Sequence, residues 1–232
     1  DLYQALFDRL GIIRVTSPIA LLETLKLLTV SGAPKGNRIA AFTASGGDCA
    51  MIADGGEPRG LLFPQPSEKI SKVLTQQLPP IATVSNPLDY TTPLWGHEEP
   101  LHDVMTTMFK DGYDAAVIVQ DYPVNQSADY LEPYHTDARA FARATREAGI
   151  PAAVCTGLSE NIDQKTRETL IASGVAPLQG IEETLDALAG AAKYGARREY
   201  VMASNSLDDL RLPPVPPMSG NPETLDEWQG KQ

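Results

Sequence analysis

The fold follows from one stretch of sequence, Arg38-Ile-Ala-Ala-Phe-Thr-Ala-Ser-Gly-Gly-Asp-Cys-Ala-Met-Ile-Ala-Asp54. Its first part, residues 38–44, is almost continuously apolar, which is typical of a strand buried on both faces of a sheet. Ser45, Gly46 and Gly47 then form a tight loop, and a helix is predicted to begin directly after it. A buried strand that turns at once into a helix predicts the first unit of an alternating β/α fold.

The sequence after Asp54 repeats this alternation. Further strands are predicted at residues 61–63, 82–84, 115–119, 152–155 and 175–178, and helices at 67–78, 99–110, 136–148, 163–173 and 182–196. Apolar strands separated by helices indicate a parallel sheet covered on both faces. With right-handed crossovers, the expected fold is α/β, a doubly wound parallel sheet of the flavodoxin-like type.

The first residues depart from this alternation. Residues 1–10 predict an amphipathic helix, and residues 12–15 a short strand. Ser17 and Pro18 then supply an N-cap and a first helical residue for a leucine-rich helix. The strands that pair with this unit are expected to lie elsewhere, and residues 32–37 are expected to be a linker.

The last residues also depart from it. Five prolines within residues 211–222 predict a stiff, extended linker, and residues 224–232 are typical of the start of a helix. At the other end, the sequence begins at Asp1 without a methionine, inside an amphipathic pattern. We therefore expect the chain to be an internal segment of a longer protein.

The composition is that of a globular protein of 232 residues, with 42% hydrophobic and 21% charged residues. The net charge of −11 argues against nucleic acid as a partner, because phosphate backbones are bound through clustered Lys and Arg. No apolar run approaches the roughly 20 residues that cross a bilayer. Without a signal-peptide pattern, a cytoplasmic protein with no membrane partner is expected. Cys49 and Cys155 are expected to be reduced, and no metal-site spacing is present.

The loop Ser45-Gly46-Gly47 is the first candidate for chemistry. Glycines let a ligand approach the backbone, and a helix N-terminus offers unpaired N–H groups and the positive end of the helix dipole. Such a loop can hold a phosphate. The structural alternative is a tight turn that needs glycine for its geometry alone. Asp48 would cap the helix but would also compete with an incoming anion.

A second candidate is the run Asn86-Pro-Leu-Asp-Tyr-Thr91. Asn86 is held extended by the proline next to it, and Asp89 can cap the turn or helix that it precedes. Asn86, Asp89 and Thr91 are therefore candidates for lining a ligand site, with a plain structural turn as the alternative. Gln120-Asp121 and residues 156–160 come after two clear strands, where open α/β sheets place ligands, although for any single residue a solvated loop is the better explanation.

The three histidines carry no recognisable chemistry. His97, His102 and His135 have neither metal-ligand spacing nor a neighbouring nucleophile motif. Ser45 lacks the G-x-S-x-G surroundings of a nucleophile elbow. No catalytic residue is therefore assigned within this sequence.

The same blocks, taken in order, resemble a known family. Residues 36–54 resemble the opening of the ligase domain of NDP-forming acyl-CoA synthetases, the relatives of succinyl-CoA synthetase and ADP-forming acetyl-CoA synthetase. Asn86-Pro-Leu-Asp89 is similar to the Asn-Pro-x-Asp element downstream in that domain. Residues 113–119 resemble its next central strand. The order and spacing of these three blocks are more specific than any one of them.

The resemblance extends to both ends and implies a domain division. Residues 1–35 resemble the end of the preceding succinyl-CoA-ligase-like domain with a linker, and residues 36–200 the flavodoxin-like ligase domain. Residues 201–232 resemble a Pro-rich linker and the start of an ATP-grasp domain. The family's Ser-His-Thr-Gly-Ala phosphohistidine loop precedes the first helix and is not in this sequence.

The function that the resemblance implies is that of an acid–CoA ligase, which makes an acyl-CoA from a carboxylate, CoA and ATP with Mg²⁺. Its ATP-grasp domain would phosphorylate the histidine, the phosphoryl group would pass to the carboxylate, and CoA would displace it. The implied partners are the CoA-binding, phosphohistidine-bearing and ATP-grasp domains of the same chain, and a small carboxylic acid. The phosphoryl-holding role falls on Ser45, Gly46, Gly47, Asp48 and Cys49. This segment is expected to be inactive alone and to hold no cofactor tightly.

Two other classes of function compete with this interpretation. One is a noncatalytic module that keeps the ligase fold for assembly or regulation. The other, a flavin or nucleotide binder, rests on fold analogy alone. The sequence leaves open the identity of the carboxylic acid, the choice between adenine and guanine nucleotide, and the oligomeric state.

Overall fold

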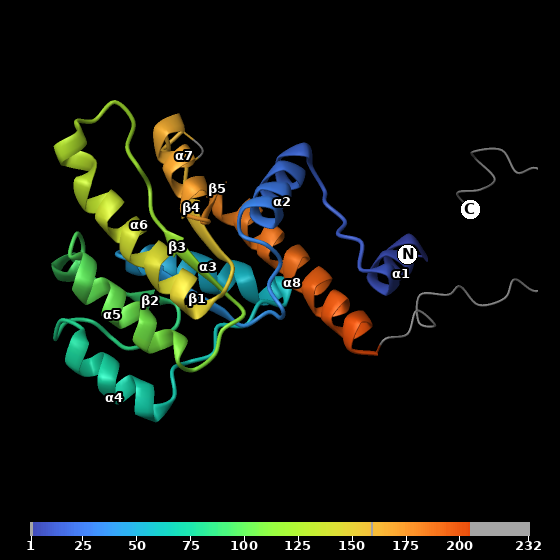
Figure 1. The fold of residues 1–232 in the computed structure, drawn as a ribbon, viewed down its shortest axis with the longest axis horizontal. Helices are drawn as coiled ribbons and strands as arrows, with labels where there is room; N and C mark the ends of the chain where they lie inside the picture. The colour runs from blue at the N-terminus through green and yellow to red at the C-terminus, as the bar shows by residue number, and fades with distance from the viewer. Residues whose placement is uncertain (1, 159, 205–232) are drawn as a thin grey trace, which may run out of the picture.

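A parallel sheet forms the centre of the molecule (Figure 1). The computed structural model describes residues 2–158 and 160–204, and in this part of the chain five strands lie in the order β2-β1-β3-β4-β5, each parallel to its neighbours. This is the strand order of flavodoxin-like sheets, so the predicted fold class is confirmed. The strands are β1 (Ile39–Thr43), β2 (Leu88–Asp89), β3 (Ala115–Val119), β4 (Ala152–Thr156) and β5 (Ala176–Gln179).

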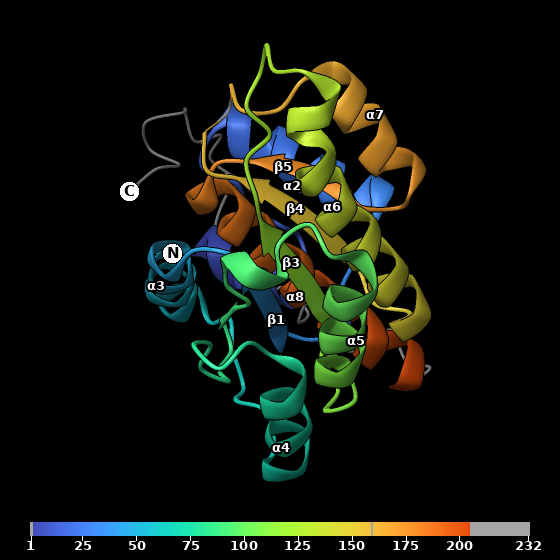
Figure 2. The same ribbon diagram turned by 90° about the vertical axis from the view of Figure 1, so that its left-hand side faces the viewer.

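Helices cover both faces of the sheet (Figures 1 and 2). One layer consists of α4 (Glu68–Gln77), α5 (Glu98–Phe109), α6 (Ala128–Ala148) and α7 (Gln164–Ala172). The opposite layer consists of α2 (Pro18–Val30), α3 (Gly46–Gly56) and α8 (Ile181–Ser204). The first helix is α1 (Leu2–Leu10), and short 3₁₀ helices at Glu57–Arg59 and Thr92–Leu94 come after α3 and β2.

Alternate side chains of β1 enter two separate cores. Ala40 and Phe42 belong to the core beneath α4, α5 and α6, whereas Ile39 and Ala41 belong to the core beneath α2, α3 and α8. All four residues are at most 1% exposed. The strand has no solvent-facing side, which explains its continuous apolar sequence.

The helix α2 is part of this second core. Leu27 is fully buried, Lys26 donates to the Pro177 carbonyl oxygen at 2.8 Å, and the Gln179 N–H donates to the buried carboxylate of Glu23 at 3.1 Å. The helix therefore packs on β5 and α8 of the same domain. That residues 1–35 derive from a preceding domain stays a prediction.

Two of the short strands predicted from sequence are wrong. Residues 12–15 have no ladder partner and run along α8, with Ile13 packed against Gly190. Residues 61–63 form only one bridge, in which Leu62 pairs with Arg38. The next residue is Pro64, which has no N–H to donate, so the pairing cannot continue.

A third predicted strand, at residues 82–84, is also wrong, because the chain pairs with β1 only at Leu88–Asp89. Before that point the side chain of Asn86 takes the place of a strand. Its amide oxygen accepts the Ala41 N–H at 3.0 Å, and its amide nitrogen donates to the Ile39 carbonyl oxygen at 2.8 Å. The edge of β1 is thus satisfied by one side chain instead of a backbone ladder.

The helices agree with the sequence apart from their ends. The helix predicted at 136–148 begins earlier, at Ala128, where Ser127 caps it, and it contains Pro133 near its start. The last helix continues to Ser204, past the predicted domain end at residue 200. The predicted linker and final helix at 205–232 lie outside the described residues. Over the described part of the chain, no helix has the length and apolarity to span a membrane.

Candidate functional site

The candidate site lies where β1 ends and α3 begins. The predicted start of α3 at Asp48 is corrected to Gly46, with Ser45 as the N-cap residue. The Ser45 hydroxyl accepts the Asp48 N–H at 3.4 Å, and the Ser45 N–H donates to the Thr43 hydroxyl at 3.2 Å. These contacts fix the strand-to-helix turn and orient the first turn of α3.

Gly46 and Gly47 present free backbone donors. Both residues are exposed, and within the described residues no acceptor pairs with either N–H group. A Cβ added at Gly46 would lie 3.5 Å from a carboxylate oxygen of Asp89, and one at Gly47 would lie 3.7 Å from the Ser45 hydroxyl, both ordinary contact distances. The turn therefore does not exclude a side chain, and the free N–H groups can bind an acceptor from outside.

Three carboxylates surround this edge of the sheet, and each already accepts a hydrogen bond. Asp48 accepts from the Thr43 hydroxyl at 3.2 Å, and Asp89 accepts from the Thr91 N–H at 2.9 Å. Asp121, after β3, accepts from the Gly157 N–H at 2.8 Å. In residues 2–158 and 160–204, no Lys, Arg or His forms an ion pair with any of the three, nor do they form part of a group suited to a metal ion.

The pKa of the Cys49 thiol shows the combined effect of burial and of the nearby carboxylates. Burial, and then the charges of Asp89 and Asp48, raise the pKa of its thiol to about 12. A helix N-terminus alone lowers a thiol pKa, so the two carboxylates and burial outweigh the dipole here. Cys49 is a neutral thiol at physiological pH and is not an activated nucleophile.

The predicted lining residues Asn86, Asp89 and Thr91 occupy different environments. Asn86 is 3% exposed, and its amide is engaged by β1, as the structural-turn alternative requires. Asp89 lies beside Gly46. Thr91 is half-buried and has a positive φ of 64°, and its buried hydroxyl oxygen has no partner among the described residues. The structure thus brings Asp89, but not the Asn86 side chain, to the loop Ser45-Gly46-Gly47, the glycine loop, and Thr91 is joined to it only through Asp89.

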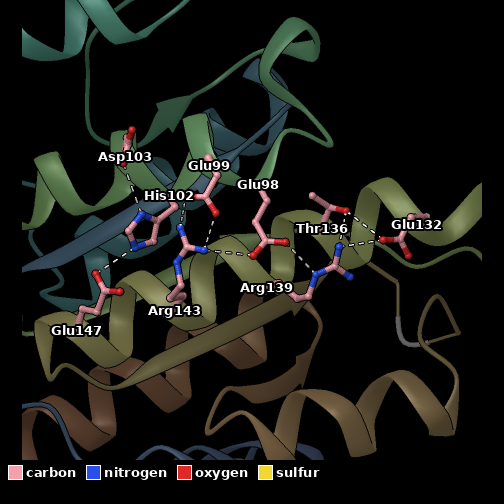
Figure 3. Close-up of polar contacts among 9 residues, drawn as sticks. All are labelled: Glu98, Glu99, His102, Asp103, Glu132, Thr136, Arg139, Arg143 and Glu147. Carbon is pink, nitrogen blue, oxygen red and sulfur yellow. Dashed lines mark hydrogen bonds and ion pairs between the residues drawn. The ribbon is translucent and has the colours of Figure 1, made fainter.

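The histidines lie on other parts of the molecule. His102 joins α5 to α6 through Glu147, at 3.0 Å, within an interhelical network that also pairs Arg139 and Arg143 with glutamates (Figure 3). His135 borders a hollow between α6 and α7, where burial lowers its pKa. His97 is exposed before α5. The charged network around His102 therefore joins α5 to α6, and none of the three histidines lies at the glycine loop.

The comparisons with known proteins point in one direction. No protein-family model matches the sequence. Over 88 residues, which are 38% of this chain and 19% of the relative, the sequence is 35% identical to the acetate–CoA ligase [ADP-forming] II subunit alpha of Pyrococcus furiosus. The chain is therefore homologous to that subunit over part of its length.

Solved structures share the fold. A Pyrococcus horikoshii OT3 protein, PH0766, matches with a TM-score of 0.70 and 21% identity over 84% of this chain. The dinucleotide-forming acetyl-coenzyme A synthetase 1 of Ca. Korarchaeum cryptofilum matches over 88% of this chain, with a TM-score of 0.68 for its apo form and 0.66 for its complex with phosphate and ADP. The chain spans 43–44% of the length of these proteins, so it corresponds to less than half of each.

Proposed function

We propose that this chain, a partial homologue of an ADP-forming acetate–CoA ligase alpha subunit, is the domain of an acyl-CoA synthetase that receives a phosphoryl group at the start of α3. The observation that carries the proposal is the pair of exposed, unpaired N–H groups of Gly46 and Gly47. Each can donate a charge-assisted hydrogen bond to a phosphoryl oxygen, and the helix dipole favours negative charge there.

The acidic surroundings limit how this site can work. A free phosphate would be attracted by two N–H groups but repelled by Asp48 and Asp89, and within the described residues no cation pairs with these carboxylates. Weak binding of free phosphate is therefore expected. A phosphoryl group tethered to another part of the same protein arrives at a high effective concentration, which compensates for weak intrinsic affinity.

Repulsion by Asp48 and Asp89 also favours rapid release of a phosphoryl group from the site. A phosphoryl group that is held only while it is tethered leaves readily once it has been transferred to an acceptor. In this proposal, a phosphohistidine from elsewhere in the protein presents the group, a carboxylic acid accepts it, and CoA then displaces it. ATP, Mg²⁺ and CoA act at the other domains, and this chain alone has no synthetase activity.

The test uses the enzyme that contains these residues, incubated with γ-labelled ATP and Mg²⁺. We expect acid-labile, base-stable phosphate on the protein, because phosphohistidine has that stability, and loss of the label when CoA and the carboxylic acid are added together. A folded enzyme with its histidine present that takes up no label would contradict the proposal.

The competing proposal is a noncatalytic module that keeps the ligase fold. The observation in its favour is the cluster of Asp48, Asp89 and Asp121 without a paired cation in the described residues. It predicts that no label enters the protein and that replacing Gly46 has no effect on any phosphoryl transfer. The labelling experiment separates the two proposals directly.

A further inference from the structure

Asp137 is a buried carboxylate that joins the segment after β2 to α6. It has no exposed surface, and its Oδ2 accepts the Tyr90 O–H at 2.7 Å. Its Oδ1 accepts the Gly96 N–H at 2.8 Å. Tyr90 and Gly96 stand at the two ends of the segment 90–96. One carboxylate therefore fixes both ends of this segment to the same point of the helix.

The segment begins beside the glycine loop. The Tyr90 N–H donates to the Thr43 carbonyl oxygen at 2.9 Å, which places Asp89 next to the end of β1. The Asp89 Oδ1 is occupied by the Thr91 N–H, while its Oδ2 lies 3.5 Å from the Cβ position at Gly46. Thr91 adopts a φ of 64°, which is rare for a β-branched residue, so its surroundings must hold it there.

We propose that Asp137 is a positioning residue, which holds Thr91 where the Thr91 N–H donates to the Asp89 carboxylate. This hydrogen bond keeps the Asp89 carboxylate away from the free N–H groups of Gly46 and Gly47. The inference rests on the proposed function, because it concerns the same N–H groups. When the segment is released, Asp89 is free to cap α3, an arrangement that the helix dipole favours. Asp89 then competes with the phosphoryl group.

The ionisation of Asp137 supports this role. Burial raises its pKa to about 6, against hydrogen bonds from Tyr90 and Gly96 and the charge of His97, which lower it. Tyr122 also faces Asp137, and burial raises the pKa of both tyrosines, so that they stay neutral. At neutral pH Asp137 is an anion that accepts both hydrogen bonds. Below a pH of about 6 it gains a proton, and the segment is held less firmly.

The experiment is a double-mutant cycle on the 232-residue chain. Inorganic phosphate is titrated at a pH of about 7.5, above the pKa of Asp137, while the amide NMR signals of Gly46 and Gly47 are followed. Asp137→Asn is expected to weaken phosphate binding about threefold to tenfold, the range that corresponds to the net contribution of one ordinary hydrogen bond. In an Asp89→Asn background the same substitution is expected to have no effect. Glu23→Gln, which changes a buried carboxylate on the opposite face, is the matched control and leaves binding unchanged.

Two results would overturn the inference: Asp137→Asn leaving phosphate affinity unchanged, or weakening it equally with and without Asp89. If the wild-type signals of Gly46 and Gly47 do not respond to phosphate even at the highest concentration that the protein tolerates, the weak binding that the proposed function expects is absent, and the proposed function fails. The amide signal of Thr91 then decides the positioning role, which is wrong if Asp137→Asn leaves that signal in place. Should Asp137→Asn not fold, Tyr90→Phe removes one of the two hydrogen bonds and must act in the same direction.

Discussion

At the scale of single residues, the candidate site is a balance between backbone donors and carboxylates. The Gly46 and Gly47 N–H groups are free, while Asp48 and Asp89 lie close enough to raise the pKa of the Cys49 thiol. A helix start is usually electropositive. Here burial, and then the charges of Asp89 and Asp48, raise the pKa of the Cys49 thiol instead. This balance supports our proposal that the site receives a tethered phosphoryl group and binds free anions only weakly.

The reactivity of the Cys49 thiol tests how strongly burial and the nearby carboxylates act on this residue. Because the pKa of its thiol is raised to about 12, alkylation by iodoacetamide at a pH of about 8 is expected to be far slower than for a free cysteine with a pKa of about 8.5. Asp89→Asn removes one cause of the raised pKa and is expected to speed the reaction by roughly threefold to tenfold. Peptide mass spectrometry follows the rate, with the fully buried Cys155 as an internal control. Alkylation of Cys49 at the rate of a free thiol in the wild-type chain would contradict the account.

The glycine loop was predictable from sequence, but its electrostatic surroundings were not. Ser45, Gly46 and Gly47 are consecutive, so the turn and the helix after it can be inferred from local pattern. Asp89 and Asp121 come from other strands, and their approach depends on β2 and β3 lying on either side of β1. Local pattern also gave no sign that Asp137, in the middle of a helix, reaches Tyr90.

At the scale of elements, the edge of β1 is held by a side chain. Asn86 supplies three hydrogen bonds, to the Ala41 N–H and to the carbonyl oxygens of Ile39 and Pro64, at 3.0, 2.8 and 3.1 Å. A search for apolar strand segments cannot detect that the Asn86 side chain takes the place of a strand, because Asn86 is polar. The apolar residues 82–84 therefore predict a strand, although the chain pairs with β1 only at Leu88–Asp89.

Asn86→Ala is therefore expected to be strongly destabilising. It leaves the buried Ala41 N–H without a partner, and we expect a loss of about 2–4 kcal/mol in the free energy of unfolding. Asn37→Ala, which removes an exposed hydrogen bond to the Gly60 carbonyl oxygen, is the control and is expected to cost less than about 1 kcal/mol. Urea unfolding followed by circular dichroism measures both. Equal losses in the two variants would show that Asn86 does not carry the edge of β1.

At the scale of the whole molecule, two cores on opposite faces of the sheet explain which features the sequence predicted well. The alternation of apolar strands and helices determines the flavodoxin-like order, and the structure confirms it. The position of α2 was harder to predict from the sequence. Its buried face includes Glu23 and Thr24 as well as Leu27. Leu21, Leu22 and Leu25 are exposed, so most of its leucines do not mark the side that packs on α8 and β5.

The chain spans 43–44% of the length of the solved structures that share its fold, and its role within a larger synthetase is our proposal. The central claim is that the start of α3 receives the phosphoryl group. The measurement that tests it most directly is the rate at which labelled phosphate is discharged from the enzyme containing these residues, on addition of CoA and the carboxylic acid.

Gly46→Ala and Gly46→Asp are the variants to compare. A methyl group at Gly46 meets only an ordinary contact with Asp89 at 3.5 Å, whereas a carboxylate brings negative charge to the position that the phosphoryl group must approach. We expect Gly46→Ala to discharge at nearly the wild-type rate. Gly46→Asp is expected to accept label from ATP normally but to discharge it about 10²-fold more slowly, as for loss of an oxyanion donor. Discharge of the Gly46→Asp enzyme at the wild-type rate would contradict the account.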